Sequence, residues 1–187
     1  MLSTLVDYEP DTVIQKMCGS RKNSHGLNEE DGFKISEVLK KNKFHPLSNL
    51  EKLIAQGMDI NAVDEGLDEN LLQYAARTGN LSLVKFLKHK GANIDDRNKR
   101  GENAYIIACR NGNFKIADFL LFSGSKLNSK NFLGMNALHI VTKEANHDCM
   151  CRLVERGINV NAQDKKGRTA LHYATYLGDL ETTVLLI

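Results

Sequence analysis

The feature of this sequence that most constrains its fold is a repeat with a period of 33 residues. Four segments align without gaps: DENLLQYAARTGN (68–80), GENAYIIACRNGN (101–113), GMNALHIVTKEAN (134–146) and GRTALHYATYLGD (167–179). One position of this alignment, the anchor, is held in turn by Asn70, Asn103, Asn136 and Thr169. A fixed period of this length is typical of arrays in which one small structural unit stacks on the next.

An earlier, degenerate copy precedes these four. Its second half, LSNLEKLIAQG (47–57), is similar to LSLVKFLKHKG (81–91). Gly57 follows Ser36 by 21 residues, which is also the spacing from anchor to glycine in the later copies. Because Ser36 and Asn70 are 34 residues apart, one inserted residue lies in the loop DEGLDEN between the two copies.

Elementary packing explains what one copy does. In DENLLQYAARTGN a first short helix carries small and apolar side chains on one face, and Gly79 supplies the left-handed residue that ends it. A second helix carries an apolar stripe at helical spacing. The residues of these two faces are Leu71, Leu72, Ala75 and Ala76, then Leu83, Val84 and Leu87. One such unit cannot bury its apolar faces alone, so neighbouring copies must stack, and we expect an all-α solenoid.

The segments DKKGRTALHYATYLGD (164–179) and GINVNAQD (157–164) resemble the ankyrin repeat family, and the resemblance covers about residues 33–187. It implies about five to six repeats, each a pair of antiparallel helices connected by β-hairpin loops. The proline of the family's T-P-L-H motif is absent from every copy. In the fourth copy Ala145 replaces the usual turn glycine, so that turn is expected to be strained or reshaped.

The resemblance also sets the predicted domain boundaries. The first to fifth copies span about residues 33–63, 64–97, 98–130, 131–163 and 164–187, the last one truncated. Residues 1–32 are interpreted as a degenerate N-terminal capping repeat with an irregular loop, or as a helical extension unrelated to the repeat. Because Leu185, Leu186 and Ile187 would form a half-covered apolar end, we expect the chain to be a fragment of a longer protein.

Composition and charge indicate an ordinary intracellular protein. The chain of 187 residues has a net charge of +2, which is too small to indicate nucleic-acid binding. It holds no apolar run long enough to cross a bilayer and no basic region typical of a secretory signal. Four cysteines without CxxC spacing indicate reduced thiols. We expect a cytoplasmic or nuclear location, or the cytosol of a host cell if the chain belongs to a secreted effector.

The string ANHDCMCRL in the fourth copy concentrates possible metal ligands. The alignment puts Cys149 at the position of Leu83, which faces the core, and Cys151 at the position of Lys85, which faces solvent. Two residues along a helix differ by about 200° in direction, so these thiols cannot share a metal ion. We predict no metal site here, with Cys149 and Cys109 as core residues.

His139 and His172 recur at one repeat position, which invites a catalytic interpretation. In the family that the sequence resembles, this histidine is structural and forms hydrogen bonds between neighbouring repeats. No nucleophile with a paired base and no glycine-rich phosphate loop is apparent in the sequence. We therefore predict a chain without catalytic residues, cofactor or small-molecule substrate.

Candidate contact residues follow from the same resemblance, because partners of ankyrin proteins usually meet the hairpin tips and the exposed end of each first helix. Fifteen positions carry over, and twelve of them are chosen as candidate contacts: Lys99, Arg100, Arg110, Phe132, Leu133, Met135, Lys143, Lys165, Lys166, Arg168, Tyr176 and Leu177. The other three are Glu102, Asn111 and Glu144. The stretch NFLGMN stands out because the equivalent tips read NKRGEN and DKKGRT. Either a neighbouring repeat covers its three large apolar residues, or they contact a partner.

The leading hypothesis is a non-catalytic interaction module that binds a protein or peptide through its hairpin tips and concave face. Apolar contacts flanked by basic tips favour a partner with an apolar anchor and acidic surroundings. The alternative is a targeting or substrate-recruiting domain of a larger enzyme or secreted effector whose catalytic part follows residue 187. A third hypothesis is nucleic-acid binding through the basic tips. Membrane insertion is not expected.

Overall fold

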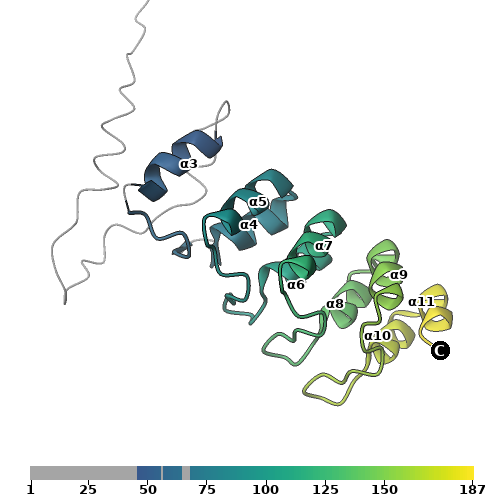
Figure 1. Cartoon of the computed structure of the whole chain (residues 1–187). Coiled ribbons are helices and arrows are strands. Elements are labelled where there is room, and N and C mark those ends of the chain that lie inside the picture. The colour runs from purple at the N-terminus through teal and green to yellow at the C-terminus, as the bar shows by residue number, and fades with distance from the viewer. Residues whose placement is uncertain (1–45, 56, 65–67) are drawn as a thin grey trace, which may run out of the picture.

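The fold is a row of stacked helix pairs, with loops that project from one edge of the row (Figure 1). The computed structural model describes residues 46–55, 57–64 and 68–187. Its helices are α3 (Pro46–Ala55), α4 (Leu71–Thr78), α5 (Leu81–His89), α6 (Ala104–Arg110), α7 (Phe114–Phe122), α8 (Ala137–Lys143), α9 (His147–Glu155), α10 (Ala170–Leu177) and α11 (Leu180–Leu185). Two short strands, β1 (Val63–Asp64) and β2 (Glu69–Asn70), form an antiparallel hairpin.

Each first helix begins at the repeat anchor because that residue caps it. The side-chain oxygens of Asn70, Asn103 and Asn136 accept hydrogen bonds from the third backbone amide of α4, α6 and α8, at 2.9, 3.1 and 3.2 Å. Asparagine is a preferred cap since it satisfies a donor that the first helical turn leaves without a partner. The spacing of the anchors along the chain therefore sets the spacing of the helices.

Contacts between successive first helices hold the stack together. Helix α4 packs against α5 and α6, α6 against α7 and α8, and α8 against α9 and α10. Ala75, Ala108 and Ala174 occupy equivalent positions and are fully buried, and their small side chains let neighbouring helices approach closely. One continuous core extends from Leu50 in α3 to Ala170 in α10. The prediction of an all-α solenoid is confirmed.

The turn within each helix pair needs a left-handed residue. Gly79, Gly112 and Gly178 have φ angles of 77°, 70° and 69°, and Ala145 takes the same conformation with a φ of 53°. A side chain with a Cβ resists this region of backbone space. The strain predicted at the turn of the fourth copy is therefore present in the backbone.

The structure tests only part of the predicted repeat boundaries, because the N-terminal residues lie outside the described ranges. The proposed capping repeat at 1–32 lies outside the described residues, as does Ser36 with the first helix of the first copy. Helix α3 lies where the second helix of that copy is expected. The exact repeat count and the boundaries between copies stay predictions.

Candidate partner-binding groove

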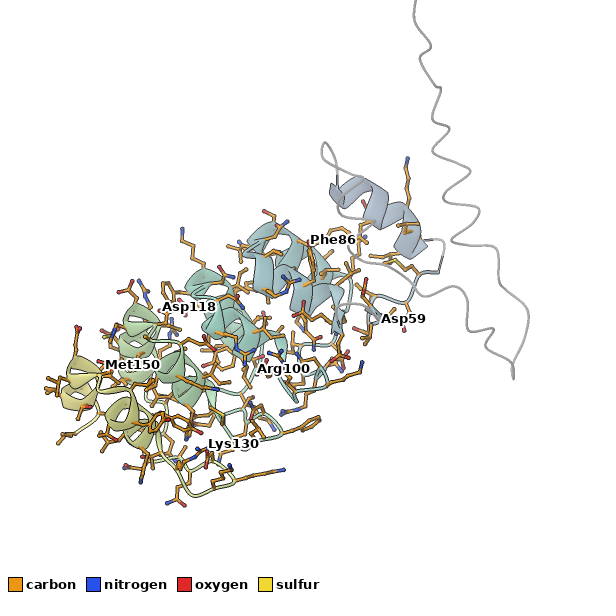
Figure 2. All side chains as sticks on the ribbon, turned by 180° about the vertical axis from the view of Figure 1, so that it is seen from behind. Asp59, Phe86, Arg100, Asp118, Lys130 and Met150 are labelled. Carbon is orange, nitrogen blue, oxygen red and sulfur yellow. The ribbon has the colours of Figure 1, made fainter. Side chains whose placement is uncertain are left out.

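The hairpin tips lie along one edge of the stack, apart from the second helices. Figure 2 shows Arg100 and Lys130 among the loops, and Asp118 and Met150 among the helices. Residues of the tips are therefore separated in space from the core of each helix pair.

Successive tips are hydrogen-bonded to one another. The backbone N–H of Phe132 donates to the carbonyl oxygen of Arg100 at 3.0 Å, and the N–H of Lys165 donates to the carbonyl oxygen of Leu133 at 2.9 Å. Gly101 makes the first contact possible, because a Cβ there would lie 2.5 Å from the backbone nitrogen and ring of Phe132. The tips are thus a continuous surface rather than separate loops.

A groove of about 360 Å³ is bounded by the tips of the third and fourth copies and by helices α6 and α8. Seven of the twelve predicted contact residues line it: Lys99, Arg100, Arg110, Phe132, Leu133, Met135 and Lys143. The other lining residues are Glu102, Asn131, Ile140 and Glu144. The remaining predicted residues belong to the fifth copy and do not line this groove; they are Lys165, Lys166, Arg168, Tyr176 and Leu177.

Two apolar side chains at the rim of the groove are open to solvent. Phe132 is 56% exposed and Leu133 is 63% exposed. Of the two interpretations of NFLGMN, cover by a neighbouring repeat therefore fails for these side chains, although the Phe132 ring lies against Gly101 on one side. Contact of these two side chains with a partner stays a prediction.

Met135 is a correction to the predicted surface. Its side chain is buried, with 5% exposed. The oxygen of the Asn131 side chain accepts hydrogen bonds from the N–H groups of Leu133 and Met135, which closes the turn of this tip. Glu69 and Glu102, which precede Met135 by two periods and one period, are also buried. Met135 therefore forms the floor of the groove rather than its rim.

Part of the predicted basic surface is neutralised within the chain. Three of the predicted basic residues form ion pairs, which are Lys99 with Asp68, Arg110 with Glu102, and Arg168 with Asp164. For the other four, no carboxylate of the described residues lies within 4.0 Å of the charged group; they are Arg100, Lys143, Lys165 and Lys166. These four are the cations most available to a partner.

Arg168 is held tightly inside the fifth copy. Its guanidinium donates to Asp164 at 2.8 Å and stacks 4.7 Å over the ring centre of Tyr173. Burial alone would raise the pKa of Asp164, but hydrogen bonds from Tyr173 and Arg168 outweigh it and hold that pKa well below its usual value. The ion pair therefore stabilises the tip of the fifth copy and takes Arg168 out of the available basic surface.

Of the two recurring histidines, His139 forms a hydrogen bond between the fourth and fifth copies. Its Nε2 donates to the carbonyl oxygen of Arg168 at 3.0 Å. Gln73, at the equivalent position of the second copy, donates to the carbonyl oxygen of Glu102 in the same way at 3.4 Å. Burial lowers the pKa of His139, which favours the neutral ring that this bond uses. His172 in the fifth copy is exposed.

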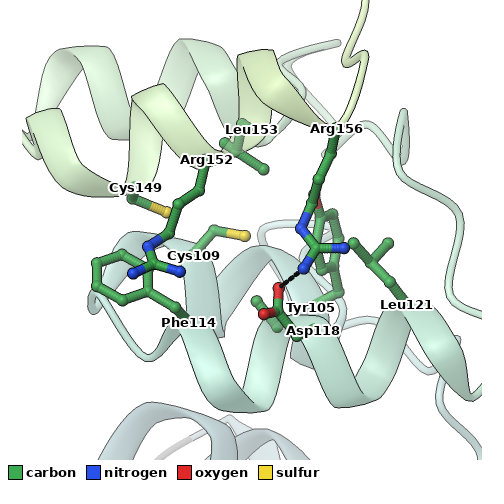
Figure 3. Close-up of a pocket in the computed structure, with 10 residues that line it drawn as sticks. Tyr105, Cys109, Phe114, Asp118, Leu121, Cys149, Arg152, Leu153 and Arg156 are labelled. Atoms are coloured by element: carbon green, nitrogen blue, oxygen red, sulfur yellow. Dashed lines mark ion pairs between the residues drawn. The ribbon is translucent and has the colours of Figure 1, made fainter.

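The cysteines of the fourth copy diverge as the helical period predicts, with Cys149 buried and Cys151 exposed. Figure 3 shows a cavity of about 10 Å³ where α9 meets α6 and α7, with Cys109, Cys149 and Tyr105 among its lining residues. Contact with Cys149 and burial raise the pKa of Cys109, and contact with Cys109 lowers the pKa of Cys149. Within the described ranges no group of three or more His, Cys, Asp or Glu residues could hold a metal ion.

Stacked helix pairs, linked tips and a groove between them define a helical repeat protein of the solenoid class. The chain belongs to the ankyrin repeat family, because it matches the family of ankyrin repeats (three copies) over residues 41–131 and 118–187. The comparison with curated proteins gave no match. Ankyrin repeats are generally protein–protein interaction modules, and the family is generally non-catalytic. Among the helices of the described residues, none has the length and apolarity needed to span a membrane.

Proposed function

We propose that this chain is a non-catalytic intracellular scaffold that binds a protein or peptide in the groove between the third and fourth tips. The observation that carries the proposal is the exposure of Phe132 and Leu133 at a tip whose neighbours carry lysine or arginine. Covering such side chains removes apolar surface from water, which favours association. The groove behind them offers room for the apolar anchor of a partner.

Charge supports an acidic partner. Four cations and two carboxylates line the groove, and two of the cations, Arg100 and Lys143, have no carboxylate of the described residues within 4.0 Å. Lys165 and Lys166 are exposed on the next tip. An excess of positive charge attracts an acidic segment and raises its association rate. Tyr176 and Leu177, at 89% and 49% exposed, would extend the apolar contact into the fifth copy.

Alanine at both Phe132 and Leu133 tests the proposal. Peptides selected on the wild-type chain from a displayed random library should bind the double variant at least tenfold more weakly, since central apolar anchors carry most of the binding energy. The thermal melt followed by circular dichroism should not change, because both side chains are largely exposed.

Phe122→Ala is the matched control, because Phe122 is 93% exposed on α7 and does not line the groove. It should leave peptide binding unchanged. Selected peptides that bind the double variant as well as the wild type would place the binding surface elsewhere. A lowered melting temperature of the double variant would show that the two side chains stabilise the fold.

The two other hypotheses are tested separately. If the chain is a recruiting domain of a larger enzyme or secreted effector, the same groove would hold the substrate, and the complete reading frame would reveal the catalytic part. Nucleic-acid binding through the basic tips predicts an affinity that falls steeply with salt, and binding that is absent or insensitive to salt excludes it.

A further inference from the structure

The second and third copies contain the same ion pair at the same repeat position. In the second copy Nε of Arg77 lies 2.8 Å from Oε2 of Glu69. One period later Arg110 pairs with Glu102. Both glutamates are buried, and a buried carboxylate is tolerated only when a cation or hydrogen-bond donor accompanies it. The pair therefore places opposite charges in contact within each copy, although Oε2 of Glu102 and Nε of Arg110 have no hydrogen-bond partner among the described residues.

The fourth copy keeps the cation of this pair and lacks the carboxylate. One period after Glu102 and Arg110 the chain has Met135 and Lys143. In the described part of the chain, no carboxylate oxygen lies within 4.0 Å of the Lys143 amine. Lys143 is exposed at the end of α8, so its charge faces water rather than a partner inside the protein.

The unmatched lysine is at the groove and not on a distant face. Lys143 and Met135 line it together with the Glu102–Arg110 pair of the preceding copy. Glu144 also lines the groove, but it does not pair with Lys143. A ligand in the groove would thus meet the Glu102–Arg110 ion pair on one side and a lysine beside an apolar floor on the other.

We infer that Lys143 binds the side-chain carboxylate of an aspartate or glutamate that the partner brings into the groove. This inference rests on the proposed function and names one recognition element of it. The partner carboxylate takes the role that Glu69 and Glu102 have in the earlier copies, and an adjacent apolar residue of the partner packs on Met135. The fourth copy thus leaves one half of an internal contact of the second and third copies to be completed by the ligand.

Selection from a displayed random-peptide library, in which every peptide is flanked by display-protein sequence at both ends, tests the inference. Binders selected on the wild-type chain should be enriched in Asp or Glu next to a large apolar residue. Lys143→Gln should weaken the acidic binders by up to about fivefold, the upper end of the range for an exposed ion pair, and selection on this variant should lose the acidic enrichment. Lys115→Gln, which removes an exposed lysine on α7 outside the groove, should do neither.

Met135→Glu tests the role of Lys143 by supplying a carboxylate within the fourth copy. It restores inside the fourth copy the acid–base pair of the third, so Lys143 would be occupied and the acidic enrichment should again disappear. Lys143→Gln keeps the test decisive if Met135→Glu does not fold, because residue 143 is exposed.

The outcomes separate the inference from the proposed function. Binders that need Phe132 and Leu133 but show no acidic enrichment, or that bind Lys143→Gln as tightly as the wild type, would overturn the role of Lys143 and leave the groove as the binding site. Binders that are insensitive to Phe132, Leu133 and Lys143 alike would overturn both.

Discussion

The third and fourth copies share one backbone arrangement and differ in how they treat one pair of positions. The third copy buries Glu102 against Arg110 and so pairs the two charges internally. The fourth copy has Met135 and Lys143 at the same positions, with the methionine buried and the lysine unpaired among the described residues. Its tip is also apolar, whereas the tips on either side are basic.

This difference shows which parts of a repeat the fold requires and which it leaves free. The anchors Asn70, Asn103 and Asn136 cap the first helices of three aligned copies. Alanine lies between the helices in the second, third and fifth copies, and Val141 takes that buried position in the fourth. The charged pair can be replaced without loss of the stack. A solenoid can therefore contain copies that serve stability and a copy whose surface is available to a partner.

The largest effect is expected when the third copy is made to resemble the fourth. Glu102→Met removes the buried carboxylate and leaves Arg110, whose side chain is 25% exposed, without its partner. We expect a loss of about 2 kcal/mol in the free energy of unfolding, the range for orphaning one member of a largely buried pair. Urea denaturation measures it.

The double variant Glu102→Met with Arg110→Lys sharpens this test, since it reproduces the Met–Lys combination of the fourth copy. It should recover part of the loss, because a lysine can extend its amine into water more easily than arginine can withdraw a planar guanidinium. A single variant as stable as the wild type would mean that the two copies do not differ energetically at this position.

A smaller effect is expected at the turn of the fourth copy. Ala145→Gly should raise the free energy of unfolding by about 1 kcal/mol, because glycine adopts the left-handed conformation without the penalty of a Cβ. Gly112→Ala is the reciprocal change in the third copy, where an added Cβ would lie 3.0 Å from Nδ2 of Asn146. It should lower stability. If both variants shift the melting temperature in the same direction, the turn is not strained in the way that its φ of 53° indicates.

The smallest effect concerns pH. Burial lowers the pKa of His139 in the folded state below its usual value of about 6.5. The unfolded chain then binds a proton more readily, so the contribution of this ring is complete above about pH 6.5 and is lost as the pH falls toward the folded-state pKa.

His139→Gln provides the control, because the second copy uses Gln73 at this position and keeps the bond to the neighbouring copy. The variant should match the wild type at pH 8 and lose less stability between pH 7 and pH 5 in thermal melts. Parallel pH profiles of the two proteins would show that His139 does not contribute to the pH dependence of stability.

Much of the fold could be predicted because local rules decide it. The anchors Asn70, Asn103 and Asn136 are residues with strong capping preference, so their spacing gave the starts of the helices. The helical period also placed Cys149 inside and Cys151 outside, as the structure has them. These features depend on residues a few positions apart in the chain.

The groove was harder to predict because its parts come from two copies and from side-chain directions within a tight turn. Met135 was wrong as an exposed contact because its side chain is buried at the floor of the groove. Ile140 and Asn131 were not singled out, although both line the groove. The pairing of Lys99 with Asp68 depends on how a loop with an inserted residue meets the next tip, which spacing alone does not determine.

Photo-cross-linking tests the central claim, that the groove beside Phe132 is the surface that meets a partner. Benzoylphenylalanine would replace Phe132 in one protein and Phe122 in another, each expressed in the cell that makes the chain. We expect a discrete protein adduct from position 132 and none from position 122, although Phe122 is the more exposed of the two at 93% against 56%. An adduct from position 122 with none from position 132 would contradict it.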